Sequence, residues 1–125
     1  MRDFQQRKSA RSERWARENA APRLKHEVPK LASLRMNLVE LSGVHSIAGT
    51  RRIQHVVVDQ ASSRFEVACG ETKCEDGGHD LTRIALTQLR AGQAAFEGTS
   101  ECTGRVGDRP CERRLQYSFE ATYTK

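Results

Sequence analysis

The sequence lacks any long hydrophobic run. Apolar residues make up 37% of its 125 residues, and no stretch of about 18 apolar residues, the length that a membrane helix requires, occurs in it. The opening residues MRDFQQRKSARSERW contain none of the apolar core of a secretory signal peptide. We therefore expect a cytoplasmic protein, in a compartment where cysteines are rarely paired as disulfides.

Common catalytic motifs are also missing. The sequence contains no glycine-rich phosphate loop, no H-E-x-x-H, no G-x-S-x-G and no deaminase signature. The C-x-x-C spacing of thiol-redox enzymes is absent as well. We therefore rank an enzyme third among three functional hypotheses. It would use zinc-bound water, a thiolate beside Lys73 or Arg105, or His79 with Asp80 as acid and base.

Five segments carry strand patterns. In most of them apolar and polar residues alternate, and one contains the β-branched run Val56-Val57-Val58. These segments are residues 34–38, 52–59, 64–69, 94–100 and 115–123. We expect 52–59 and 64–69 to form a hairpin through a turn at 60–63.

One segment carries a helix pattern. Apolar side chains recur at helical spacing at Leu81, Ile84, Ala85 and Leu89. Asp80 is a suitable N-cap and Gly92 a suitable stop. The order β-β-β-α-β-β predicts an α+β fold with a small, mostly antiparallel sheet and the helix on one of its faces.

The net charge divides the chain into two parts. Residues 1–25 hold eight basic and three acidic side chains, a net charge of +5, whereas the other hundred residues hold thirteen of each sign. Pro22 and Pro29 bracket a connector, because each removes a backbone donor and favours extended geometry before it. We therefore predict a basic N-terminal arm with its connector at residues 1–30, helical or disordered, and a folded body at residues 31–125.

Four cysteines form the strongest cluster of chemically active residues. They occur as two pairs, Cys69 with Cys74 and Cys102 with Cys111, beside glycine-containing loops. Two such loops can converge on one tetrahedral zinc ion, and a site closed by four cysteines would be structural. Over residues 69–111 the two pairs resemble the ligand pairs of zinc-ribbon proteins. Four free buried thiols and two local disulfides remain the alternatives, and we expect His79 to be an ordinary loop residue rather than a ligand.

The basic arm is the second cluster. Arginine-rich segments with aromatic residues can pair with phosphates and stack on bases. We predict nucleic-acid binding by Arg7, Lys8, Arg11, Arg14, Trp15, Arg17, Arg23 and Lys25. The leading hypothesis is thus a noncatalytic accessory protein that binds RNA or DNA, with the ribosome or another nucleoprotein assembly as its host. The alternative is a protein-interaction module whose N-terminal helix docks on an acidic partner, and no membrane partner is expected.

Overall fold

The computed structural model describes residues 12–41, 49–71 and 73–124. Residues 12–20 are helical and precede the remaining elements. These are α2 (Leu24–Glu27), β1 (Leu31–Leu41), β2 (Gly49–Val56), β3 (Glu66–Val67), β4 (His79–Asp80), α3 (Thr82–Arg90), β5 (Ala95–Glu101), β6 (Arg105–Val106), β7 (Arg109–Pro110) and β8 (Arg114–Tyr123).

The main sheet has four antiparallel strands in the order β2-β1-β8-β5. Two further pairs, β3 with β4 and β6 with β7, form small two-stranded sheets. The prediction of an α+β fold with a small antiparallel sheet and one main helix is therefore confirmed. Alternation along the strands decides which face is buried: in β1, Leu34, Met36 and Leu38 are buried, whereas Arg35 between them is exposed.

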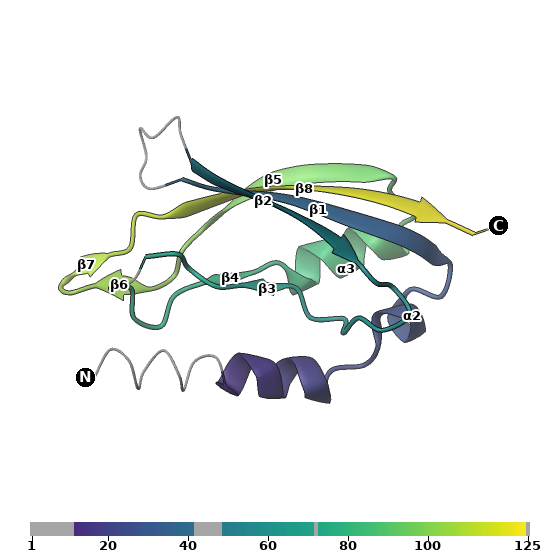
Figure 1. The fold of residues 1–125 in the computed structure, drawn as a ribbon, viewed down its shortest axis with the longest axis horizontal. Helices are drawn as coiled ribbons and strands as arrows, with labels where there is room; N and C mark the ends of the chain where they lie inside the picture. The colour runs from purple at the N-terminus through teal and green to yellow at the C-terminus, as the bar shows by residue number, and fades with distance from the viewer. Residues whose placement is uncertain (1–11, 42–48, 72, 125) are drawn as a thin grey trace.

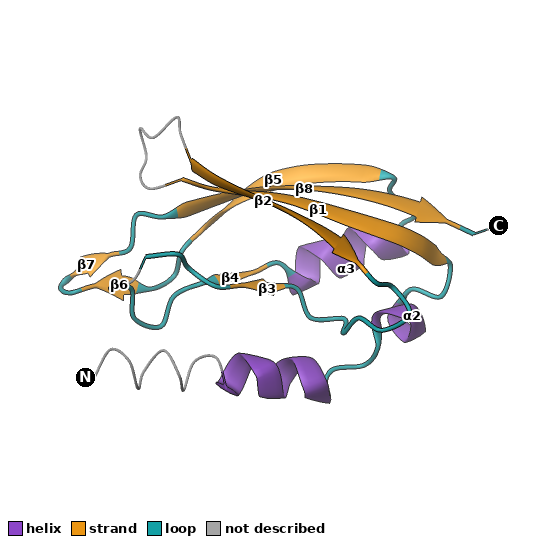
Figure 2. Cartoon of the chain, in the orientation of Figure 1, coloured by secondary structure: helices purple, strands orange, loops and turns teal. Residues whose placement is uncertain are grey.

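The core lies between the main sheet and α3, which runs under one face of the sheet (Figure 2). Phe119 of β8 is almost fully buried, stacks on Phe96 at a centroid distance of 4.7 Å and meets the edge of Phe65 at 5.9 Å. Leu24 and Val28 also belong to this core. The buried cluster therefore extends into the segment that precedes Leu31.

The predicted hairpin between residues 52–59 and 64–69 is wrong. β3 pairs instead with β4, through Glu66 opposite Asp80 and Val67 opposite His79. The turn between the two segments bonds to the connector, because Leu24 N–H donates to the Ala61 carbonyl and Ser63 N–H to the Pro22 carbonyl. These long-range backbone bonds direct the chain away from β2, and local alternation gives no sign of them.

The helix is confirmed, with two corrections. Ile84 does not lie on the buried face, since it is 38% exposed, whereas Ala85 and Leu89 are buried. The N-cap is Leu81 rather than Asp80, although the Asp80 carboxylate accepts the N–H of Thr82 at 3.0 Å. Gly92 ends the helix as expected, with a φ of +76° that favours glycine.

The N-terminal helical segment is attached to the body by an ion pair. The Arg17 guanidinium lies 2.8 Å from the Glu66 carboxylate, and the Glu66 side chain is only 12% exposed. In Figure 1 the segment runs beneath β3 and β4, on the side of these strands away from the main sheet. Among the described residues, no helix has the length and apolar character needed to cross a membrane.

Candidate metal centre

The four cysteine sulfur atoms lie together beyond one end of the main sheet. All four Sγ atoms fall within 4.8 Å of one another. Cys69 follows β3 and Cys74 lies in the loop before β4, whereas Cys102 follows β5 and Cys111 follows β7. In Figure 1 these loops meet beside the β6–β7 hairpin. The two sequence-local pairs therefore form one cluster that can hold a metal ion.

The distances between sulfur atoms match ligation better than disulfide bonding. The Sγ atoms of Cys69 and Cys111 are 3.7 Å apart, and those of Cys74 and Cys102 are 3.6 Å apart. Four sulfurs at about 2.3 Å from a tetrahedral zinc ion would be about 3.8 Å from one another, whereas a disulfide bond measures about 2.05 Å. The short distances also join cysteines of different loops, so local disulfides within each sequence pair do not describe this geometry.

Backbone pairing and two glycines bring the loops this close. Glu75 N–H donates to the Arg105 carbonyl at 2.8 Å, and Arg105 N–H donates back at 3.0 Å. A Cβ atom on Gly77 would collide with the sulfurs of Cys74 and Cys102, and one on Gly104 would collide with Cys74 and lie 2.5 Å from the Gly77 Cα. Glycine is therefore required sterically at both positions.

Backbone N–H groups also point at the sulfur atoms. Cys102 Sγ accepts from Gly78 and Gly104, each at 3.4 Å, and Cys69 Sγ accepts from Glu71 at 3.5 Å. Although burial opposes ionisation of Cys102, the hydrogen bonds from Gly104 and Gly78 and from neighbouring thiols lower its pKa. Such donors stabilise thiolate, the form of cysteine that binds metals.

Without a cation the cluster disfavours several thiolates at once. Burial, together with the negative charge of Cys102 and against the effect of the Glu71 N–H, raises the pKa of Cys69 to about 12. Burial, followed by a hydrogen bond with Cys102, raises the pKa of Cys74 as well. A bound divalent cation would remove this penalty, because it supplies the opposite charge at the centre of the sulfur cluster.

Glu40 supports both loops from the end of β1, a role that we did not predict from the sequence. Its carboxylate is buried and accepts the Gly70 N–H at 2.9 Å. It also forms an ion pair with Arg113 at 2.9 Å, and Arg113 reaches Glu71 at 3.5 Å. The residues adjacent to Cys69 and near Cys111 are thus held by one carboxylate. The sequence contained a sign of this, since Glu40 continues the inward alternation of Leu34, Met36 and Leu38.

His79 is a buried strand residue in β4, and the expectation of an ordinary loop position is wrong. It is 3% exposed, and its Nδ1 lies 2.9 Å from the Ser100 hydroxyl. Burial lowers its pKa, although the negative charge of Glu40 acts in the opposite direction. His79 is not part of the metal-ligating cluster found among the described residues.

The predicted nucleic-acid-binding residues lie in different settings. Arg7, Lys8 and Arg11 fall outside the described residues. Three others carry internal bonds: Arg17 to Glu66, Arg23 to the Gln60 carbonyl and Lys25 to the Leu31 carbonyl. Trp15 is 68% exposed on the helical segment, where Arg14 is its half-buried neighbour. The arm is therefore partly engaged with the body and partly open.

Comparisons with known proteins add no relative. No protein-family model, curated protein or solved structure gives a significant match to this chain.

Proposed function

We propose that the protein is a noncatalytic accessory protein that binds RNA or DNA through its basic arm, in the cytoplasm and as part of a larger nucleoprotein assembly. The observation that carries the proposal is the exposed indole of Trp15 on a helical segment within the arm that holds the whole net charge. An exposed indole beside cations offers a stacking surface for an unpaired base together with charge for its phosphates.

The metal centre has a supporting role in this proposal. We assign zinc to it, held by Cys69, Cys74, Cys102 and Cys111, because four thiolates in a closed cluster suit tetrahedral zinc and leave no position for substrate. Zinc would supply a fixed crosslink between the two loops. Gly77 and Gly104 leave room for the sulfur atoms to approach one another, because neither residue has a Cβ atom.

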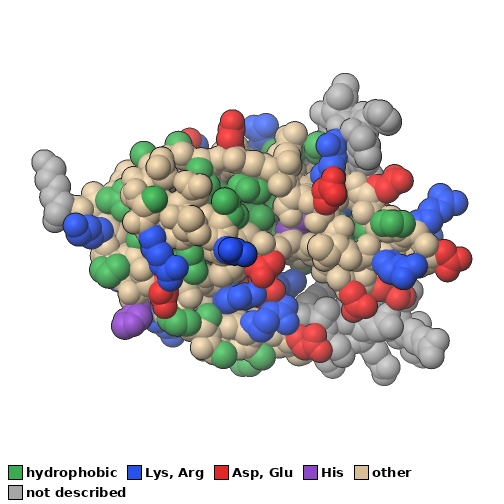
Figure 3. All heavy atoms as spheres, turned by 180° about the vertical axis from the view of Figure 1, so that it is seen from behind, with side chains coloured by type: hydrophobic (Ala, Val, Ile, Leu, Met, Phe, Trp, Pro, Cys, Tyr) green, Lys and Arg blue, Asp and Glu red, His purple; other side chains and the backbone are tan. Residues whose placement is uncertain are grey.

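The body has no net charge, so it adds no net attraction for phosphates to that of the arm. Figure 3 shows basic and acidic side chains interspersed over the rear face of the molecule, without a large area of one sign. This distribution agrees with the equal numbers of basic and acidic residues after position 25. Long-range electrostatic attraction from net charge would therefore come from the arm.

The test is salt-dependent binding of a fluorescent single-stranded oligonucleotide to the full chain. If about five phosphates are neutralised, log affinity should fall with log salt with a slope near −3.5, a loss on the order of a hundredfold between about 50 and 200 mM. Trp15→Ala should weaken binding by about 1–3 kcal/mol if a base stacks on the indole, and Trp15→Phe should retain most of it.

A truncation provides the matched control. Deletion of residues 1–20 removes the exposed helical segment but keeps Leu24, which is fully buried in the core. The truncated protein should stay folded and lose most of its affinity. Equal affinity of the full and truncated chains, or no binding at low salt, would reject the proposal and favour an acidic protein partner for the N-terminal helix.

A further inference from the structure

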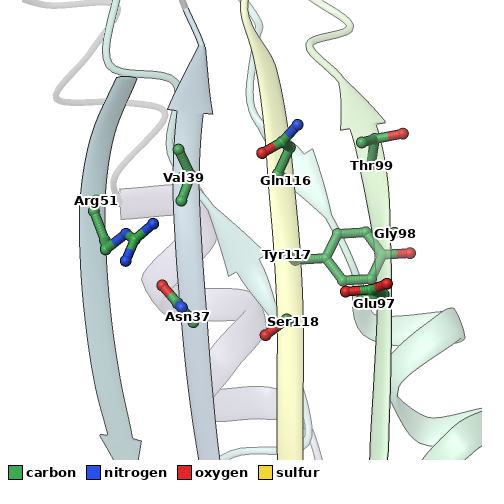
Figure 4. Close-up of a pocket in the computed structure, with 9 residues that line it drawn as sticks. All are labelled: Asn37, Val39, Arg51, Glu97, Gly98, Thr99, Gln116, Tyr117 and Ser118. Atoms are coloured by element: carbon green, nitrogen blue, oxygen red, sulfur yellow. The ribbon is translucent and has the colours of Figure 1, made fainter. Parts of the chain in front are cut away.

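The outer face of the main sheet carries a shallow depression of about 460 Å³. Figure 4 shows that its lining residues come from all four strands of the sheet. Strand register arranges the outward side chains in two adjacent rows: Arg51, Val39, Gln116 and Thr99, then Ile53, Asn37, Ser118 and Glu97. The volume falls within the range of roughly 300–1,000 Å³ that is typical of small-molecule sites.

Two opposite charges border this depression without neutralising each other. Arg51 on β2 and Glu97 on β5 have no ion-pair partner among the residues that the structure describes. One row further along the same face, Arg35 and Glu120 pair with each other at 3.0 Å. The charges of that neighbouring row therefore neutralise each other, whereas the two charges that border the depression do not.

Uncharged polar groups lie between these charges. The lining includes the amides of Asn37 and Gln116 and the hydroxyls of Thr99 and Ser118. The Asn37 Oδ1 atom is buried without a hydrogen-bond partner among the described residues. Because a buried acceptor without a partner costs free energy, a rotation of the Asn37 amide that brings this oxygen to a donor from outside the chain would be favourable. The polar lining fits a polar ligand rather than an apolar one.

The arrangement matches the groups of a nucleotide. A guanidinium pairs well with phosphate oxygens, and a glutamate can accept a hydrogen bond from the exocyclic amino group of a base. Amides between these two groups can pair with the planar edge of the base. We infer that the depression binds one nucleotide of single-stranded nucleic acid, with its phosphate toward Arg51 and an amino-bearing base toward Glu97.

This is a second site, formed only by residues of the body and independent of the arm. The test is a titration of the isotope-labelled full chain with CMP, cytidine and UMP, followed by amide NMR. CMP should shift the amide signals of Asn37, Arg51, Glu97 and Gln116. Arg51→Ala should weaken CMP by about tenfold and leave cytidine unchanged, whereas Glu97→Ala should weaken CMP by about tenfold and leave UMP unchanged.

Matched controls come from the paired row of the same face. Arg35→Ala and Glu120→Ala should leave the affinity for CMP unchanged, and a short cytidine oligonucleotide should shift the same amides as CMP. Absence of shifts at these amides at millimolar CMP, or equal losses in the control variants, would overturn the inference. Equal shifts with inorganic phosphate alone would also overturn it, because they would indicate an anion site only.

The outcome is separable from that of the proposed function. The arm is tested by oligonucleotide affinity after deletion of residues 1–20, whereas this site is read from body amides with mononucleotides. Binding of CMP by the truncated chain, together with unchanged oligonucleotide affinity on truncation, would retain this site and reject the arm.

Discussion

The Glu40 carboxylate contacts the chain beside both loops of the metal centre. The Glu40 side chain is only 8% exposed, and its carboxylate accepts the Gly70 N–H and pairs with the Arg113 guanidinium. A buried charge is tolerated when it is paired and hydrogen-bonded, and removal of one partner leaves the other unsatisfied. The carboxylate thus links the end of β1 to the chain on both sides of the cluster.

Glu40→Gln should lower the free energy of unfolding by about 1.5–3 kcal/mol, because it removes the charge from hydrogen bonds to Arg113 and Gly70. The comparison is Glu120→Gln, which removes the same charge from the exposed pair with Arg35 and should cost less than about 1 kcal/mol. Urea unfolding of both variants measures the difference. Equal losses would mean that the Glu40 network does not support the loops.

Gly104 tests the close approach of the two loops. Gly104→Ala adds a Cβ that would collide with the Cys74 sulfur and the Gly77 backbone, so we expect a loss of about 1–3 kcal/mol and reduced metal content. Thr103→Ala, at an exposed neighbouring position, should change neither quantity. Metal analysis together with thermal unfolding decides the matter, and normal metal content in Gly104→Ala would show that the loops are further apart than described.

At the scale of elements, the long strands could be predicted and the short ones could not. β8 alternates along its whole length and β1 alternates from Leu34 to Leu38, and the structure places both strands at the centre of the main sheet. β3 and β4 contribute only two residues each to their ladder, which is too short for any periodic signal. Beside their ladder the Leu81 N–H donates to the Phe65 carbonyl, and the turn before β3 bonds to Pro22 and Leu24. The sequence pattern therefore predicts the long strands of the main sheet better than it predicts the short strands around it.

The buried face of α3 can be tested by substitution. Leu89→Ala should cost about 2–5 kcal/mol, because Leu89 is 1% exposed in the core. Ile84→Ala on the same helix should cost less than about 1 kcal/mol, since Ile84 is partly exposed and loses little buried surface. Chemical denaturation of the two variants tests the assigned buried face. A larger loss for Ile84→Ala would reverse that assignment.

At the scale of the whole molecule, the sequence identified the cysteines but not the way in which they meet. Spacing grouped Cys69 with Cys74 and Cys102 with Cys111, whereas the short sulfur–sulfur distances run between the two loops. Convergence depends on contacts far apart in the chain, such as those of Glu75 with Arg105 and of Glu40 with Arg113. Single-sequence patterns do not report such contacts.

The central claim is that four cysteines form one metal centre that joins the two loops, and metal content per chain tests it most directly. Protein purified under reducing conditions should contain about one zinc per chain, by elemental analysis and native mass spectrometry. Cys102→Ala should lose the metal and several kcal/mol of stability, on the order expected when a structural metal site is lost, whereas Thr103→Ala should keep both. Fully folded wild-type protein without metal, with four freely titratable thiols, would contradict the account.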